Sequence, residues 1–149
     1  MSIATLLAAN CPLPAVEPQE DYPLHIDLDR GIIEDGGADD NFYLIPFEEA
    51  MLYTDKVYGV LLEWPQYTPG RAQRIIEYIK QALEQTDCVE LWQVWLSEDE
   101  KPEIYRATCS VEDCKPEDIR DLEQRQVWDT KNPERPIHYC LSITRGTPS

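Results

Sequence analysis

The sequence predicts one α+β domain, in which two helices pack on the same face of an antiparallel sheet. An apolar stripe with helical spacing runs through residues 69–84, after Thr68 at the N-cap and Pro69 at the first helical position. The charged residues of this segment, Arg71 among them, are predicted to lie on the other side of the helix. Residues 137–144 alternate apolar and polar side chains, which is typical of a half-buried strand. With 149 residues, of which 42% are hydrophobic, the chain has enough apolar surface for the core of a single domain.

The remaining elements follow from the same two periodicities and from prolines that mark the starts of helices. From residue 57 on, the predicted order is β-α-β-β-α-β, as in a split β-α-β, ferredoxin-like sheet. This core covers residues 57–145. Its members are a strand at 57–64, the helix at 69–84, strands at 88–96 and 104–111 on either side of an acidic turn, a second helix at 116–125 and the last strand at 137–144.

The residues before this core show weaker patterns. Residues 1–23 contain four prolines and little periodicity, so we expect an extended lead-in segment. Residues 24–29 alternate as a strand does, and we expect them to pair with residues 42–45 in an N-terminal hairpin. A short helical piece at 47–53 completes this part, residues 24–56, which would extend or cover one edge of the sheet.

The chain is strongly acidic, with 29 acidic and 13 basic residues, a formal net charge of −16 and a pI near 4.3. Such a surface repels phosphate backbones and anionic lipids, so direct binding to nucleic acid or to a membrane is not expected. Five cysteines, an odd number without the spacing of a disulfide framework, indicate reduced thiols. The first ten residues lack the basic segment of a secretory signal. Both features predict a cytoplasmic protein.

The charge is distributed unevenly. Residues 1–70 hold thirteen acids against two bases, a net of −11, and the rest of the chain has a net of −5. The total exceeds the ~2–8 charges that keep a small domain soluble, and like charges destabilise a folded chain. Fast capture of a cationic partner would offset that cost. The predicted partner-binding residues are acids in two loops and two tryptophans at a strand end and in a loop: Glu34, Asp35, Asp39, Asp40, Glu98, Asp99, Glu100, Trp64 and Trp128.

Few residues suggest catalytic chemistry. His138 and Cys140 are two apart in one predicted strand and therefore share a face of the sheet, the most enzyme-like pair in the chain. With Cys109 and Cys114 they also supply ligands of the types that zinc prefers, but Cys109 lies within a predicted strand rather than on a zinc knuckle. We therefore expect buried, structural cysteines, no catalytic residue, and no metal or other cofactor.

Three segments carry a resemblance to a known family. They are the strand at 59–64, the helix at 71–84 and the strand at 90–96 with its Glu-Leu-Trp element. In this strand–helix–strand pattern and its continuation to about residue 145, the chain resembles the bacterial immunity proteins of contact-dependent growth inhibition and related toxin systems. The resemblance implies a small cytoplasmic protein that binds and neutralises a cognate toxin domain, often a nuclease.

Three hypotheses about function follow. The first is an immunity protein whose acidic surface covers the active site of a cognate, basic, nuclease-type toxin domain in a 1:1 complex. The second is a nucleic-acid mimic that inhibits a DNA-binding enzyme of the host. The third is a small enzyme or zinc protein that uses Cys109, His138 and Cys140.

Overall fold

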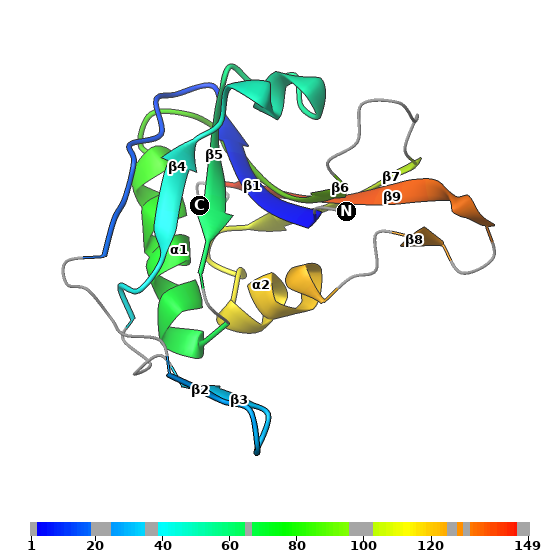
Figure 1. The fold of residues 1–149 in the computed structure, drawn as a ribbon. Coiled ribbons are helices and arrows are strands. Elements are labelled where there is room, and N and C mark those ends of the chain that lie inside the picture. Colours follow the sequence, from blue (N-terminus) through cyan, green and yellow to red (C-terminus); the bar gives the residue numbers. More distant parts are fainter. Residues whose placement is uncertain are drawn as a thin grey trace.

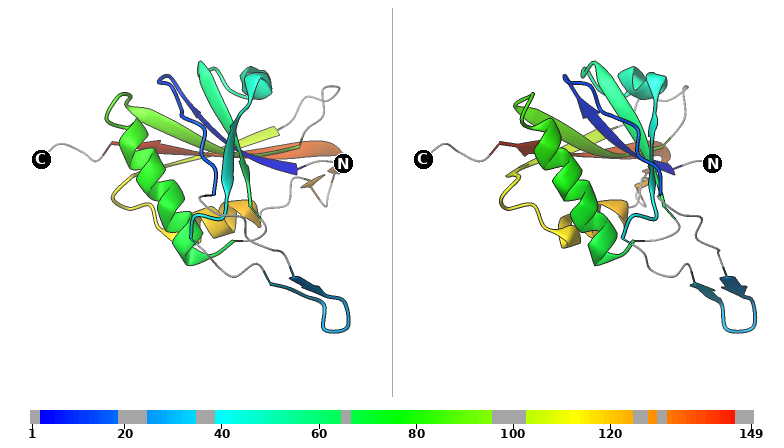
Figure 2. Two further views of the ribbon diagram at one scale, coloured as in Figure 1. Left: turned by 60° about the vertical axis from the view of Figure 1, so that its left-hand side comes forward. Right: turned by 90° about the vertical axis from the view of Figure 1, so that its left-hand side faces the viewer.

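The computed structural model describes residues 3–18, 25–34, 39–64, 67–95, 103–124, 128–129 and 132–145. Their architecture is α+β, with a mixed sheet and two α-helices on one of its faces (Figures 1 and 2). In chain order the elements are β1 (Ile3–Ala9), β2 (His25–Asp27), β3 (Ile32–Glu34), β4 (Tyr43–Pro46), the 3-10 helix η1 (Glu48–Leu52), β5 (Tyr58–Glu63), α1 (Pro69–Ala82), β6 (Cys88–Trp95), β7 (Glu103–Ser110), α2 (Pro116–Glu123), β8 (Trp128–Asp129) and β9 (Asn132–Thr144).

The main sheet confirms the predicted α+β class but differs from the predicted pairing. Over the described part of the chain its order is β4-β5-β1-β6-β9-β7, and β8 pairs with the start of β9. Neighbouring strands are antiparallel except β7 and β9, which run parallel. The expectation of a purely antiparallel sheet is therefore wrong, and the ferredoxin-like arrangement is not confirmed. The physical reason is that α2 connects β7 to its direct neighbour β9, and a helical crossover joins parallel strands.

The extended lead-in expected over residues 1–23 is wrong for residues 3–9, which form β1 in the middle of the sheet. β1 pairs with β5 on one side and with β6 on the other, so that Leu7 lies opposite both Val60 and Leu91. The four residues from Leu6 to Ala9 are at most 1% exposed. A strand buried on both faces shows a continuous apolar run instead of alternation, which is why periodicity does not reveal it.

The predicted pairing of residues 24–29 with 42–45 is also wrong. β2 pairs with β3 in a separate two-stranded sheet that projects from the rest of the molecule (Figure 1). Gly31 in the turn between them has a φ of 64°, a left-handed conformation that glycine adopts without strain. β4 pairs instead with β5, with Tyr43 opposite Glu63, and so forms one edge of the main sheet.

The main core lies between the sheet and the two helices. Thr68 caps α1 as predicted, since its Oγ1 accepts a hydrogen bond from the backbone N–H of Arg71 at 3.1 Å. The predicted apolar stripe of α1 is buried in this core. Its members and their partners on β1, β5, β6, α2 and β9 include Ala72, Ile75, Ile76, Ile79, Ala82, Leu7, Val60, Leu91, Ile119, Leu122 and Ile143.

Arg71 departs from the prediction, because its side chain is fully buried rather than on the solvent side of α1. The segment that begins at Asp39 lies against the first turn of this helix. A Cβ on Gly70 would come within 1.9 Å of Asp39 Oδ1, so the Asp39 side chain would have to move if this position carried one. Asp39 thus contacts this end of the helix from a distant part of the sequence, and helical periodicity alone does not predict such a contact.

The short helical piece expected at 47–53 is confirmed as η1, which packs on the other face of the sheet. Gly59 on β5 makes this possible, since a Cβ there would lie 2.3 Å from the Cβ of Ala50. The smaller core between η1 and the sheet contains Ala4, Leu6, Ala8, Trp92, Val94 and Cys140, with Phe47, Tyr53 and Leu61 packed against them.

Among the described helices, none is long and apolar enough to cross a membrane.

We expect Leu7→Ala to lower the free energy of unfolding by about 2–5 kcal/mol, because it removes a fully buried side chain from the central strand. Ile3→Ala, at the exposed start of the same strand, should cost about 1 kcal/mol or less. Urea unfolding followed by circular dichroism measures both variants. Equally small effects would contradict the central position of β1.

Candidate functional site

At the C-terminal end of α2, the helix face of the sheet presents mainly polar and aromatic side chains. The strand register places Leu62, Thr5, Gln93, Tyr139 and Tyr105 in one row across five strands. In the middle of this row, Gln93 Nε2 donates a hydrogen bond to the carbonyl oxygen of α2 residue 123 at 3.1 Å. A pocket lies on each side of this contact.

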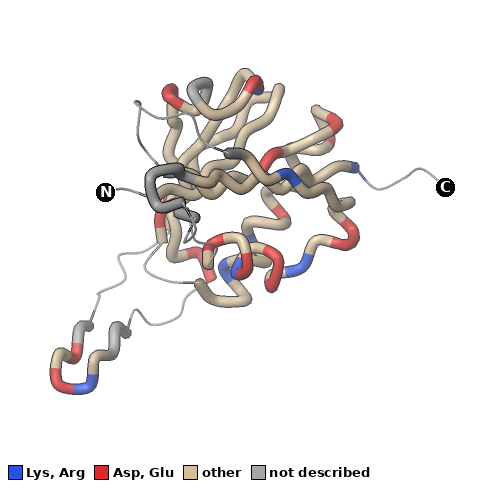
Figure 3. Tube along the Cα trace, turned by 90° about the vertical axis from the view of Figure 1, so that its right-hand side faces the viewer, with Lys and Arg blue, Asp and Glu red and all other residues tan. Residues whose placement is uncertain are grey.

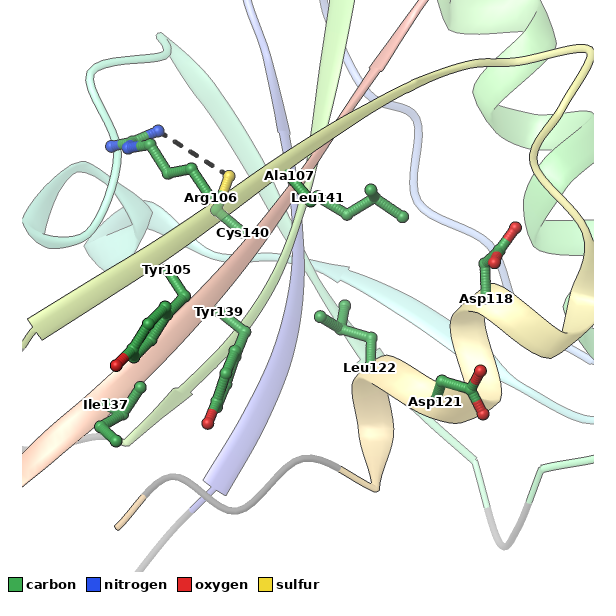
Figure 4. A pocket seen from close by; sticks show the side chains of 10 residues that line it. All are labelled: Tyr105, Arg106, Ala107, Asp118, Asp121, Leu122, Ile137, Tyr139, Cys140 and Leu141. Carbon is green, nitrogen blue, oxygen red and sulfur yellow. Dashed lines mark hydrogen bonds between the residues drawn. The ribbon is translucent and has the colours of Figure 1, made fainter. Parts of the chain in front are cut away.

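The first pocket, which we call the tyrosine pocket, lies between α2 and strands β7 and β9 and has a volume of about 670 Å³ (Figure 4). Tyr105 and Tyr139 stack with ring centroids 5.7 Å apart and ring planes 18° from parallel. Asp118 and Asp121 stand on α2 across the pocket from these rings, with Leu122 in between (Figure 4). Tyr105 is 51% exposed. An aromatic surface opposite carboxylates suits a cation, which both groups attract.

Local contacts hold the two aspartates in place. Asp118 Oδ2 accepts a hydrogen bond from the backbone N–H of Lys115 at 2.8 Å, which closes the first turn of α2. Asp121 Oδ1 lies 3.4 Å from Arg120 Nη2, in an ion pair whose side chains are about half exposed. Exposed pairs of this kind contribute ~0–1 kcal/mol, so an incoming cation can replace Arg120 at little cost. Outside the lining of this pocket, α2 and the turn before it carry further acids: Glu112, Asp113 and Glu117.

The second pocket, which we call the Glu123 pocket, has a volume of about 730 Å³ and lies between the start of β1, the ends of β5 and β6, and the end of α2. Glu123 Oε1 accepts a hydrogen bond from the indole N–H of Trp64 at 3.1 Å. Glu123 Oε2 is buried and has no hydrogen-bond partner among the residues that the structure describes. Burial raises the pKa of the Glu123 carboxyl, and the bond from Trp64 lowers it by a smaller amount.

The opposite face of the sheet holds a buried polar network centred on Glu90, which is 5% exposed. Glu90 Oε1 accepts hydrogen bonds from the Thr54 hydroxyl and from the indole N–H of Trp92, the latter at 3.1 Å. Arg106 Nη1 lies 3.5 Å from Glu90 Oε2, and the Arg106 guanidinium lies 5.2 Å from the centre of the Trp92 ring. Both carboxylate oxygens thus have partners within the chain, so the network explains the burial of Glu90 without a ligand.

The residues of the enzyme or zinc hypothesis are not brought together. Cys140 and His138 share the Glu90 face, where Cys140 belongs to the smaller core and the His138 ring lies 5.5 Å from the ring of Tyr53. Cys109 instead packs against the main core on the helix face. The described residues contain no group of three or more His, Cys, Asp or Glu side chains that could hold a metal ion.

The environment of the cysteines supports their interpretation as packing residues. Burial raises the pKa of the thiols of Cys114 and Cys140 to about 12 in each case. Burial also raises the pKa of the Cys109 thiol. All five cysteines are free thiols. A thiol with a raised pKa stays protonated at neutral pH and is a poor nucleophile.

Among the predicted partner-binding residues, Trp64 lies at a pocket, where it is half-buried and holds Glu123. Asp39 is exposed beside the first turn of α1, and Asp40 is half-buried next to it. The structure does not bring these aspartates to either pocket. Outside the described residues lie Asp35, Glu98, Asp99 and Glu100, and only the backbone is described for Glu34 in β3 and Trp128 in β8.

Local sequence patterns do not identify Tyr105, Tyr139, Asp121 or Glu123 as site residues. One usable signal exists, because both tyrosines lie within strands that the sequence predicts, and the helix at 116–125 is rich in acids. Their juxtaposition requires the parallel pairing of β7 with β9, which places Tyr105 opposite Tyr139. No local pattern indicates that pairing.

No protein-family model matches the chain, and no curated protein or solved structure gives a significant match.

We expect Glu123→Gln to stabilise the protein at neutral pH by about 1 kcal/mol, since it replaces a buried carboxylate that lacks a partner for one oxygen. The folded pKa is raised, so wild-type stability falls as the pH rises through the interval between the ordinary pKa and the raised one. The advantage of the variant should therefore disappear when the pH is lowered below the ordinary carboxyl pKa.

Chemical unfolding of both proteins across this pH range measures the difference. Glu117→Gln, at an exposed position of the same helix, is the control and should change stability by less than about 0.5 kcal/mol at every pH. A Glu123→Gln variant that is less stable than wild type at neutral pH would show that Glu123 is satisfied in the free protein.

We expect Glu90→Ala to lower the free energy of unfolding by about 3 kcal/mol, because it leaves the Trp92 N–H and the Thr54 hydroxyl without their buried acceptor. Arg106→Ala should cost less, since the Arg106 side chain is 55% exposed and Glu90 keeps two donors. Thermal and urea unfolding compare the two. A larger loss of stability for Arg106→Ala would mean that the ion pair, and not the hydrogen bonds from the neutral donors Thr54 and Trp92, holds Glu90.

Proposed function

We propose that this chain is an immunity protein that binds a basic, nuclease-type domain of a cognate bacterial toxin in the cytoplasm and covers its active site in a 1:1 complex. The observation that carries the proposal is the tyrosine pocket, which is lined by stacked Tyr105 and Tyr139 on one side and by Asp118 and Asp121 on the other, on a chain with a net charge of −16. Inhibition by occupancy needs no catalytic residue in the inhibitor. It needs a surface complementary to the one it blocks.

Long-range attraction is the first contribution to such binding. An enzyme that acts on nucleic acid must present positive charge to a phosphate backbone, so its substrate cleft attracts a strongly negative protein. Steering of this kind raises the association rate and loses strength as salt screens the charges. The excess negative charge thus acts on the partner at long range, before the two proteins touch.

Short-range contacts are the second contribution. Aromatic side chains at the centre of an interface often carry much of its binding energy, and Tyr105 is both exposed and supported by Tyr139. An aromatic centre with carboxylates beside it matches the usual anatomy of a protein interface.

The β2–β3 hairpin offers a second acidic surface. Its turn carries Asp27 and Asp29 on either side of Leu28, which is 88% exposed, and it projects from the body of the protein (Figure 3). Arg30 pairs with Asp27 at 2.7 Å and thereby lowers the pKa of that carboxyl. A projecting acidic turn of this shape can enter a basic cleft that the flatter sheet edge cannot reach.

The alternatives receive less support. A nucleic-acid mimic shares the electrostatics, but it presents carboxylates to residues that contact phosphates and has no need of an aromatic pocket. The enzyme or zinc hypothesis requires Cys109 next to His138 and Cys140, and the described structure places Cys109 on the other face of the sheet. The tyrosine pocket therefore favours the hypothesis of an immunity protein that binds a toxin domain over the two alternatives.

The test uses this chain and its cognate toxin domain, which the proposal expects to be basic and to be encoded by a neighbouring gene. We expect the association rate constant, measured by stopped-flow fluorescence, to fall about tenfold or more between low and high salt. Tyr105→Ala should raise the dissociation rate, and Asp121→Asn should slow association. Glu84→Gln is the matched control, because it removes the same charge from an exposed position remote from the pocket lining.

Two results would contradict the proposal. One is an association rate that does not respond to salt. The other is full protection of toxin-producing cells by a Tyr105→Ala, Asp121→Asn double variant that is folded and expressed at wild-type level.

A further inference from the structure

The Glu123 pocket contains a polar atom that the fold does not satisfy. Glu123 Oε2 is buried and lacks a hydrogen-bond partner among the described residues, although Oε1 of the same carboxylate is bonded to Trp64. Leaving a buried charged acceptor unpaired costs more than leaving a neutral one unpaired. A glutamate in this position is therefore unfavourable for the free protein, and a donor that enters the pocket would relieve this cost once a small rotation of the side chain turns Oε2 toward it.

The other polar side chains that line the pocket define which hydrogen-bonding groups and which charge a ligand must have. Each side-chain donor group already donates within the chain: the Thr5 hydroxyl to Gln93 Oε1 at 2.9 Å, Gln93 Nε2 to the carbonyl oxygen of residue 123, and the Trp64 indole to Glu123. The acceptors that remain are carboxylate oxygens, on Glu123 inside the pocket and on exposed Glu63 at its mouth. A ligand for this pocket is a donor, and its charge is positive.

We propose that the Glu123 pocket binds an arginine side chain of the protein partner, an inference that rests on the proposed function. A guanidinium group carries five N–H donors on a flat cation and no acceptor, so it satisfies Glu123 Oε2 without competing for the donors that are already used. Its planar form also packs against aromatic rings such as the half-buried Trp64 at the pocket wall. A volume of about 730 Å³ admits a side chain of this length.

The position of the pocket fits a role in the same interface. Glu123 follows directly on Asp121 and Leu122, which line the tyrosine pocket, so the two pockets share the last turn of α2. A basic partner that covers this turn presents cations to both. The two pockets are thus separate contact points of one surface.

The test is a titration of the full-length ¹⁵N-labelled protein with N-acetyl-arginine amide, followed through the indole N–H signal of Trp64 in NMR spectra. Trp64→Phe assigns that signal. We expect a saturable shift in the wild type and in Glu117→Gln, the matched control on the exposed side of α2. In Glu123→Gln the affinity should fall about tenfold or more, because the ligand loses its buried ionic partner. N-acetyl-citrulline amide, which has the same shape without the charge, should cause no saturable shift.

The proposal is overturned if the wild type shows no saturable shift, if citrulline binds as well as arginine, or if Glu123→Gln binds as tightly as the control. Should Glu123→Gln fail to fold, Glu63→Gln at the exposed mouth tests the same site and is expected to weaken binding about twofold to threefold. Unchanged affinity in that variant would likewise overturn it.

Failure of this inference can be distinguished from failure of the proposed function, because the titration contains no toxin. If the toxin domain binds in a salt-dependent way but arginine does not bind, the proposed arginine site is wrong and the proposed function stands. If arginine binds but the toxin domain does not, the arginine site is confirmed and the proposed function is wrong.

Discussion

The structure depends on the hydrogen bonding of β1 between β5 and β6. These two strands run parallel and are joined through α1, and β1 is antiparallel to both. Because α1 must cross β1 to connect them, the helix covers Leu7 and Ala9 on one face, while η1 and its neighbours cover Leu6 and Ala8 on the other. Both cores therefore require a strand from the first ten residues, and the start of that strand also lines the Glu123 pocket.

Two glutamates, buried Glu90 and half-buried Glu123, lie on opposite faces of this sheet and differ in how their carboxylates are hydrogen-bonded. Glu90 has Thr54, Trp92 and Arg106 as partners, so both of its oxygens are accounted for. Glu123 has only Trp64 among the described side chains. Complete satisfaction is typical of a polar group that supports the fold, whereas an incompletely satisfied group lowers stability and is typical of a position kept for function. This contrast, rather than the number of acids, is why we propose the α2 end of the helix face as the binding surface.

The parts of the fold that sequence reasoning predicts are those with local causes. The helix that starts after Thr68, the second helix at Pro116 and the alternating strand that ends at Thr144 all carry their signals within a few residues. β1 is missed because it is buried on both faces and therefore lacks alternation. The parallel β7–β9 pair and the tyrosine pocket are missed because they depend on which strands become neighbours. Trp64 is predicted as an anchor from its place at a strand end, but its partner Glu123 is 59 residues away.

In the proposed complex, the last turn of α2 would allow two contacts that are weak individually to give tight binding. Successive helical residues differ by about 100° in direction, so Asp121 and Glu123 reach different pockets while Leu122, between them, is buried in the core. The buried leucine holds both carboxylates at a constant separation. When one cation of a folded partner is bound, the second is already close to its pocket and binds as in an intramolecular reaction. Neither pocket then needs high affinity by itself, and the rigidity that Leu122 provides becomes part of the recognition.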